Sequence, residues 1–194
     1  HSATTSTDEH VFRVDDINVL PIGGTQCVGM ATRNSTDPDE IYAAVGSMVV
    51  YWVEGSSHRW DLGFANPTTT TQTVDIVEFN NVIIVSFGDS SLTNAQYITG
   101  STTSWTRAAI NSTTTHQDNY ASYLIKARNA YGNWALWKSG PSTDSGTEVN
   151  AIAWSTDPTN TGSWNPGSYF TVGSTNRAIT NLHSFGDSFV VTKI

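Results

Sequence analysis

The stretch IVEFNNVIIV, residues 76–85, consists of two short apolar runs around the pair Asn80–Asn81. Two turn residues between β-branched and aromatic runs are typical of a β-hairpin. The stretch LHSFGDSFVV, residues 182–191, repeats this pattern of strand, aromatic residue, turn pair and apolar strand. In this alignment the identical FGDS tetrapeptides at 87–90 and 185–188 lie out of register. The chain is therefore predicted to contain a repeated hairpin.

Residues 22–28 and 128–134 fit the same hairpin slot more loosely. Helical periodicity is nearly absent, because the best helical window, 37–53, is interrupted at Gly46 and continues with β-branched residues. Short apolar runs separated by Gly, Asn and Asp turns predict strands instead. These predicted strands are 74–79, 82–87, 122–127, 134–137, 149–154 and 189–191. The fold class is predicted to be all-β.

A second unit follows each hairpin and consists of a strand, a turn rich in Ser and Thr, and a Trp. It occurs at 51–60, 97–105 and 152–164, with Trp60, Trp105 and Trp164 spaced by 45 and 59 residues. A four-stranded unit of this size is typical of a β-propeller blade. The predicted units of a single β-propeller domain, 1–194, are a half-blade at 6–14, blades at 17–63, 74–108 and 120–172, and a half-blade at 179–194. They make about four blades if the halves join, or part of a larger or oligomeric ring.

These units resemble the Asp-box, or BNR, repeat of sialidase-like propellers, which reads roughly Ser-x-Asp-x-Gly-x-Thr-Trp. The best match is Ser155–Asp157 with Gly162–Trp164, lengthened by about two residues. The Trp105 copy lacks the Asp, the Trp60 copy lacks the Asp and Gly, and Ser6–Asp8 with Phe12 resembles a fourth copy. The resemblance implies blades as in phage or environmental structural proteins. It also implies that Ser and Asp cap a turn while Trp packs between sheets.

The composition excludes several classes of protein. With 9 Lys+Arg against 17 Asp+Glu and a net charge of −8, the chain has no basic surface for nucleic acid. No apolar run is long enough to span a bilayer. The lone Cys27 excludes an intrachain disulfide and, in its apolar context, favours a small core residue. Low charge and a Ser/Thr content of roughly a quarter favour an extracellular or virion-associated protein.

The sequence offers little for catalysis. The sialidase resemblance would require an Arg triplet, a Tyr–Glu pair and an acidic Asp, and no Arg of this chain stands in such a context. A glycosidase needs two converging carboxylates. Asp75 and Glu78, on a predicted innermost strand, are interpreted as solvated channel residues rather than such a pair. The His residues lack metal-ligand spacing, and the oxygen-rich loops 37–40 and 142–146 are interpreted as exposed loops without an ion. We therefore expect no enzyme activity, metal or cofactor.

Binding is better supported, because a sugar surface needs aromatic faces beside polar groups. The candidate ligand-binding residues are Trp52, Trp134, Trp137, Trp154, Asp75 and Glu78. Trp134 and Trp137 lie three apart, so on a strand they face opposite sides and one can be exposed. The sequence predicts a non-enzymatic β-propeller that acts as a binding module or a structural module. The alternatives are a lectin-like glycan binder and, less favoured, a glycoside hydrolase fragment. The expected partners are further copies or exchanged strands that complete the ring, a carbohydrate, or a surface protein.

Overall fold

The fold is described from a computed structural model. The described residues are 27–33, 40–46, 48–53, 61–65, 73–87, 95–101, 104–110, 121–139, 150–160, 163, 169–174 and 176–193. Their regular elements are fourteen β-strands in four antiparallel sheets, so the predicted all-β class is confirmed. Within these residues no helix has the length and apolar character needed to cross a membrane.

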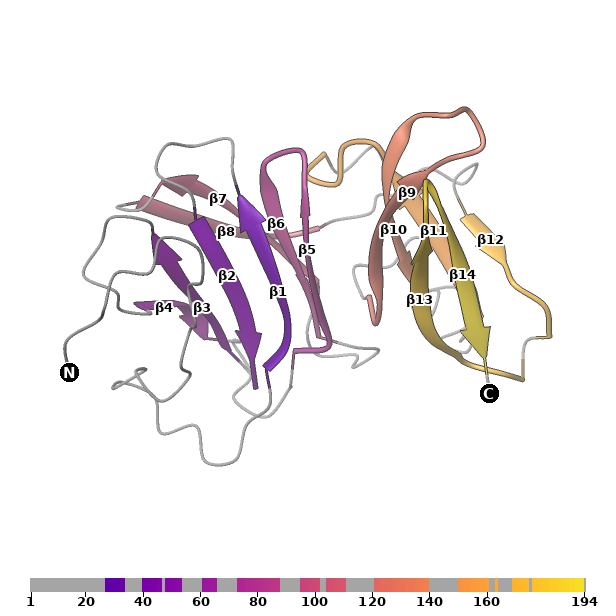
Figure 1. The fold of residues 1–194 in the computed structure, drawn as a ribbon, viewed down its shortest axis with the longest axis horizontal. Coiled ribbons are helices and arrows are strands. Elements are labelled where there is room, and N and C mark those ends of the chain that lie inside the picture. Colours follow the sequence, from indigo (N-terminus) through magenta and orange to yellow (C-terminus); the bar gives the residue numbers. More distant parts are fainter. Residues whose placement is uncertain are drawn as a thin grey trace, which may run out of the picture.

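Each sheet is a simple meander, because strands adjacent in sequence are paired (Figure 1). The first sheet contains β1 (Cys27–Arg33), β2 (Glu40–Val45), β3 (Met48–Val53) and β4 (Asp61–Ala65). The second contains β5 (Asp75–Phe79), β6 (Val82–Ser86), β7 (Gln96–Ser101) and β8 (Ser104–Ala109). The third contains β9 (Leu124–Arg128), β10 (Trp134–Ser139), β11 (Ala151–Ser155) and β12 (Tyr169–Thr171). The fourth is the hairpin of β13 (Ile179–Phe185) and β14 (Ser188–Lys193).

The turns explain why these strands end where they do. Asn80 and Asn81 have φ values of 50° and 65°, as a tight hairpin turn with two left-handed residues requires. Gly186 has a φ of 60° in the corresponding turn between β13 and β14. Gly46, with a φ of 58°, separates β2 from β3 and divides the window that has the best helical composition. The hairpins predicted at 76–85 and 182–191 are thus confirmed.

One element of the predicted repeat is wrong. Cys27 and Val28 do not begin the second strand of a hairpin, because β1 begins at Cys27 and pairs with β2 as the first strand of the described sheet. Residues 22–26 lie outside the described part. The connection equivalent to Asn80–Asn81 is 34–39, outside the described residues. The FGDS repeats are out of register as predicted: Phe87 follows β6, whereas Phe185 ends β13.

The four sheets lie in a row, and each sheet contacts the next through its first strand. β1 lies against β5, β5 against β9, and β9 against the β13–β14 hairpin (Figure 1). The approach of β1 to β5 is close, since a Cβ on Gly29 would lie 3.1 Å from Ile76 Cγ2. Three apolar cores fill the spaces between successive sheets. Large members are Tyr42 and Phe87 in the first, Phe79, Ile84 and Leu136 in the second, and Trp137, Ile152 and Leu182 in the third.

Candidate binding surface at the hairpin tips

The loop between β9 and β10 is held by one buried amide. Asn129 Oδ1 accepts hydrogen bonds from the backbone N–H groups of Tyr131, at 3.0 Å, and Asn133, at 3.1 Å. The Asn129 N–H donates to the Asn133 carbonyl at 2.8 Å, and Gly132 has a φ of 79°. An amide that satisfies several loop donors fixes the backbone in one conformation. Tyr131 therefore stands 78% exposed on a rigid loop.

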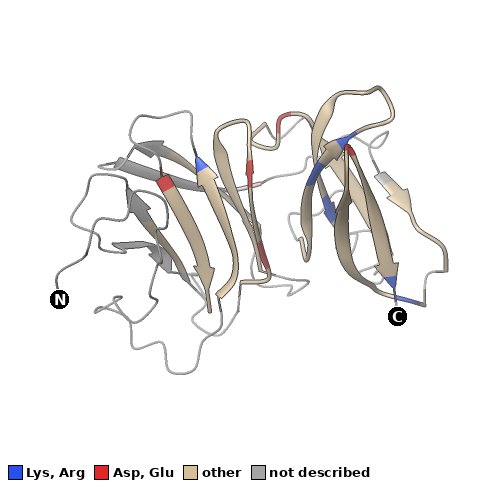
Figure 2. Cartoon of the chain, in the orientation of Figure 1, with Lys and Arg blue, Asp and Glu red and all other residues tan. Residues whose placement is uncertain are grey.

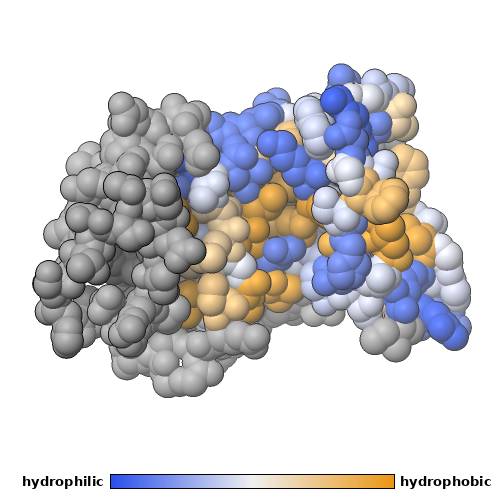
Figure 3. Space-filling model, in the orientation of Figure 1, coloured by the Kyte–Doolittle hydropathy of each residue, from blue (hydrophilic) through white to orange (hydrophobic). Residues whose placement is uncertain are grey.

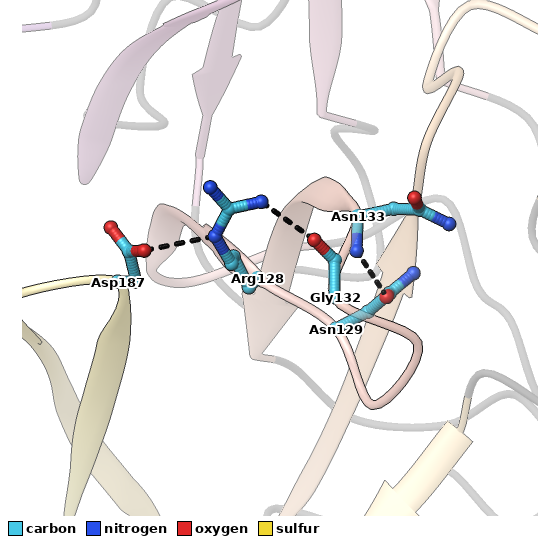
Figure 4. Close-up of polar contacts among 5 residues, drawn as sticks. All are labelled: Arg128, Asn129, Gly132, Asn133 and Asp187. Carbon is cyan, nitrogen blue, oxygen red and sulfur yellow. Dashed lines mark hydrogen bonds and ion pairs between the residues drawn. The ribbon is translucent and has the colours of Figure 1, made fainter.

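Arg128 joins this loop to the neighbouring hairpin. Its Nη1 donates to the Gly132 carbonyl at 2.6 Å and its Nε to Asp187 Oδ2 at 2.9 Å (Figure 4). Its backbone N–H also donates to the Asp187 carbonyl at 2.8 Å. The Arg128 Cζ lies 4.7 Å from the centre of the Trp134 ring, the distance of a cation–π contact. One side chain thus orients the loop, the β13–β14 turn and an indole ring.

Trp134 is the exposed member of the tryptophan pair, with 40% of its surface accessible. It lies directly opposite Arg128 in the β9–β10 register. Lys126 Nζ lies 6.0 Å from the Trp134 ring centre and 3.6 Å from Glu78 Oε2 of β5. The exposed indole therefore stands among two cations and their carboxylate partners.

Further contacts connect the turns at this end of the sheets. Asn80 Nδ2 donates to the Thr156 carbonyl at 3.2 Å, which joins the β5–β6 turn to the segment after β11. The Tyr131 and Trp154 rings meet edge to face at 6.2 Å. Charged residues gather here, around the ends of β9 and the β13–β14 hairpin (Figure 2). We call the surface formed by Lys126, Arg128, Tyr131, Trp134 and Asp187 the tip surface.

The other predicted tryptophans lie apart from Trp134. Trp137 is buried on the opposite face of β10, where its ring centre lies 4.8 Å from that of Phe189 in β14. Trp154 is half-buried beside Trp137, at 6.2 Å between ring centres. The prediction that Trp134 and Trp137 face opposite sides, with one exposed, is confirmed. The side chains of Trp52 and Trp105 lie outside the described part, as do residues 60, 164, 6–14 and 142–146.

Asp75 and Glu78 do not form a converging pair. Asp75 lies between two sheets, where Oδ2 accepts the Leu124 N–H of β9 at 2.8 Å and Oδ1 accepts the Ile76 N–H at 2.8 Å. Glu78 Oε1 accepts the Asn81 N–H of the hairpin turn at 2.7 Å. The expectation of solvated channel carboxylates is therefore wrong for Asp75, which is half-buried and ties β5 to β9.

The position of Asp75 makes stability depend on pH. Burial raises its pKa above the ordinary value, although its two backbone hydrogen bonds act in the opposite direction. The folded protein therefore binds this proton more tightly than the unfolded chain. The resulting stability is complete below the unfolded pKa of about 4 and is lost as the pH rises through the folded pKa.

We therefore expect the free energy of unfolding of wild type, relative to Asp75→Asn, to fall as the pH rises above the unfolded pKa of about 4. Urea denaturation of both proteins at several pH values measures this difference. The variant loses one acceptor at every pH, so only the pH-dependent part of the difference reports on titration. A difference that stays constant or increases with pH would contradict the expected role.

The acidic loop 37–40 ends in a buried residue rather than an exposed one. Glu40 Oε2 accepts hydrogen bonds from Arg33 Nε at 2.6 Å and from the Tyr42 hydroxyl at 2.8 Å. Burial, and then this hydrogen bond, raise the pKa of the Tyr42 hydroxyl, which stays a donor. Glu40 is therefore buried and hydrogen-bonded within the first sheet, which corrects the expectation of a fully exposed loop. Residues 37–39 lie outside the described part.

Two further expectations involve potential ligands. Cys27 is half-buried at the start of β1, so the prediction of a core cysteine is only partly met. Among the residues that the structure describes, no three His, Cys, Asp or Glu side chains are grouped to hold a metal ion.

Sequence reasoning missed four members of the tip surface: Lys126, Arg128, Tyr131 and Asp187. A local signal existed for two of them, because Lys126 and Arg128 alternate on one strand that pairs with the strand of Trp134. The contact of Arg128 with Asp187 spans 59 residues and had no such signal. Comparison of the chain with protein-family models and with curated protein sequences finds no match.

Proposed function

We propose that this chain is a non-enzymatic binding module with β-propeller architecture. Three four-stranded meanders and a hairpin pack in a row through their first strands, with a core between each pair. This supports the proposal, because propeller blades pack on one another in the same way. The segment after β11 supports the Asp-box resemblance: Ser155 Oγ accepts the Asp157 N–H at 3.0 Å and lies 2.6 Å from Ser163 Oγ. This is the turn-capping role that the repeat assigns to its serine.

The proposal of binding rests on one observation, two exposed aromatic rings held rigidly among hydrogen-bonding groups at the hairpin tips. Tyr131 and Trp134 are large, exposed and fixed, and rigid aromatic side chains bind ligands at low entropic cost. Arg128 and Asp187 are bound to each other but remain partly exposed, so each retains capacity for a ligand. Asp75 and Glu78, by contrast, accept hydrogen bonds from backbone N–H groups and do not converge on a common point. This supports a non-enzymatic role.

Carbohydrate is the ligand class that suits this surface best. The apolar face of a sugar ring stacks on aromatic side chains, while its hydroxyls bond to amide, guanidinium and carboxylate groups. The Tyr131 ring packs on Trp154 and the Trp134 ring lies under the Arg128 guanidinium, so the two rings are separate platforms. An oligosaccharide would stack one sugar unit on Tyr131 and another on the outward part of the indole. A surface that displays sugar-binding loops agrees with the proposed extracellular or virion-associated location.

We expect labelled protein to bind a subset of glycans on an array, and each of Tyr131→Ala and Trp134→Ala to weaken the best interaction about tenfold or more. Loss of an aromatic stacking partner is the physical reason. Tryptophan fluorescence titration with the selected glycan measures the affinity of wild type and Tyr131→Ala, and calorimetry that of Trp134→Ala. Met30→Ala is the control, because Met30 is an apolar residue on β1 of the first sheet whose exposure, 61%, lies between those of Trp134 and Tyr131.

An array without signal above background would remove carbohydrate as the ligand and leave the structural role. Binding that survives both aromatic substitutions would place the ligand elsewhere on the molecule.

A further inference from the structure

The apolar packing of the β13–β14 hairpin lies on one of its two sides. Leu182, Phe189 and Val191 pack on the third sheet. On the opposite side, Phe185 is 75% exposed and Val190 is 52% exposed, and apolar surface lies over the hairpin in the space-filling view (Figure 3). The second sheet, by contrast, has an apolar core on each side. Because a two-stranded sheet is marginally stable by itself, the hairpin is expected to open more easily than the other sheets.

Polar contacts attach both ends of this hairpin. At the open end, Lys193 Nζ donates a hydrogen bond to the Ser174 carbonyl, in the segment after β12, at 2.7 Å. At the turn, the Asp187 carbonyl accepts the backbone N–H of Arg128 at 2.8 Å, and Asp187 Oδ2 accepts Arg128 Nε at 2.9 Å. The contact at the turn therefore combines a backbone bond that attaches the hairpin with a side-chain bond that reaches the tip surface.

The Arg128 guanidinium carries the effect of this contact into the tip surface. Because the guanidinium is planar, holding Nε on Asp187 sets the direction of the whole group. In this orientation Nη1 donates to the Gly132 carbonyl, and Cζ lies 4.7 Å from the centre of the Trp134 ring. The Arg128 side chain is 43% exposed, so it would regain rotamer freedom without the Asp187 acceptor. Its position over Trp134 thus depends on where the hairpin places Asp187.

We propose that docking of the β13–β14 hairpin on the third sheet orders the tip surface, with Asp187 as a positioning residue that acts through Arg128. The docked hairpin holds the guanidinium in place for a ligand, and an open hairpin withdraws Asp187 and releases it. A further consequence rests on the proposed function. If the tip surface binds an oligosaccharide, binding strengthens docking by the same factor by which docking strengthens binding.

Hydrogen exchange, measured by NMR on the full chain without any ligand, tests the ordering step. Phe189→Ala removes a ring from the core under the hairpin, so the backbone N–H and the Nε–H of Arg128 should both exchange about tenfold faster. Asp187→Ala keeps the backbone carbonyl, so only the Nε–H should exchange faster, and the indole N–H resonance of Trp134 should shift. Asp187→Asn retains an acceptor and should restore slow Nε–H exchange. Phe185→Ala, on the exposed side of the hairpin, is the control and should change neither.

A double-mutant cycle tests the coupling, with the strongest-binding oligosaccharide of the array as the probe. The Phe189 ring packs on Trp137, on the face of β10 opposite to Trp134, so its loss acts on the tip surface through the hairpin. Phe189→Ala should weaken binding about tenfold in wild type and much less in an Asp187→Ala background. Saturation with the oligosaccharide should slow exchange of the hairpin amides in wild type. Val191→Ala is a smaller truncation in the same core and replaces Phe189→Ala if that variant fails to fold.

Faster exchange of the hairpin amides without a change at the Arg128 Nε–H would overturn the proposal, whether or not an oligosaccharide binds. Equal losses of affinity on Phe189→Ala in the two backgrounds would overturn it as well, because the effect would then bypass Asp187. An array without signal would remove the proposed carbohydrate ligand alone, since the exchange measurements need no ligand and still decide whether the hairpin orders the tip surface.

Discussion

Replacing Trp137 by alanine is expected to lower the free energy of unfolding by about 3–5 kcal/mol. Trp137 is 7% exposed and lies at the centre of the core between the third sheet and the β13–β14 hairpin. Its ring centre lies 4.8 Å from that of Phe189 and 6.1 Å from that of Phe170. Removing the indole leaves a cavity that two separate sheets line. The hairpin would keep its polar contacts, those of Arg128 with Asp187 and of Lys193 with the Val172 and Ser174 carbonyls, but would lose its largest apolar contact. Protease should therefore cleave near it faster.

Urea denaturation and limited proteolysis measure these effects, with Trp134→Ala as the matched control. Trp134 lies three residues away on the same strand but is exposed, so its loss should cost at most about 1 kcal/mol. Trp137→Phe should also cost much less than Trp137→Ala, because the Trp137 Nε1 has no hydrogen-bond partner in the described part of the protein. Equal destabilisation by Trp137→Ala and Trp134→Ala would show that the hairpin does not pack on Trp137.

Replacing Arg33 by methionine should cost about 3–5 kcal/mol of stability. Arg33 and Glu40 form an ion pair whose side chains are 3% and 2% exposed, at the ends of β1 and β2. The substitution removes the cation and leaves the Glu40 carboxylate buried, and an uncompensated buried charge is far less stable than the pair. Urea denaturation at neutral pH measures the loss.

Two comparisons separate the buried charge from general damage to the sheet. Lys126→Met removes the cation of the partly exposed Lys126–Glu78 pair and should change stability by no more than about 1 kcal/mol. The triple variant Arg33→Met, Glu40→Met, Tyr42→Phe removes the charges together with the hydroxyl that donates to Glu40, so it should recover much of the loss. A triple variant that is no more stable than Arg33→Met would contradict the unpaired-charge explanation.

The strands and turns followed closely from local sequence. The 76–85 hairpin was predictable because Asn80 and Asn81 accept left-handed backbone and the flanking residues favour strands. The opposite orientation of Trp134 and Trp137 followed from their odd spacing. The error at 22–28 arose because a Gly–Gly pair before an apolar run resembles a hairpin turn wherever it stands, and only pairing with β2 identifies Cys27 as the start of a first strand.

The sequence by itself determined where strands form and where hairpins turn, because these depend on residues a few positions apart. The tertiary structure alone decided which face of each strand meets a neighbouring sheet. That packing buries Trp137 and leaves Trp134 exposed, places Asp75 beside the Leu124 N–H and brings Arg128 to Asp187. These contacts join residues up to 59 positions apart, and side-chain chemistry without knowledge of the sheet order cannot select them.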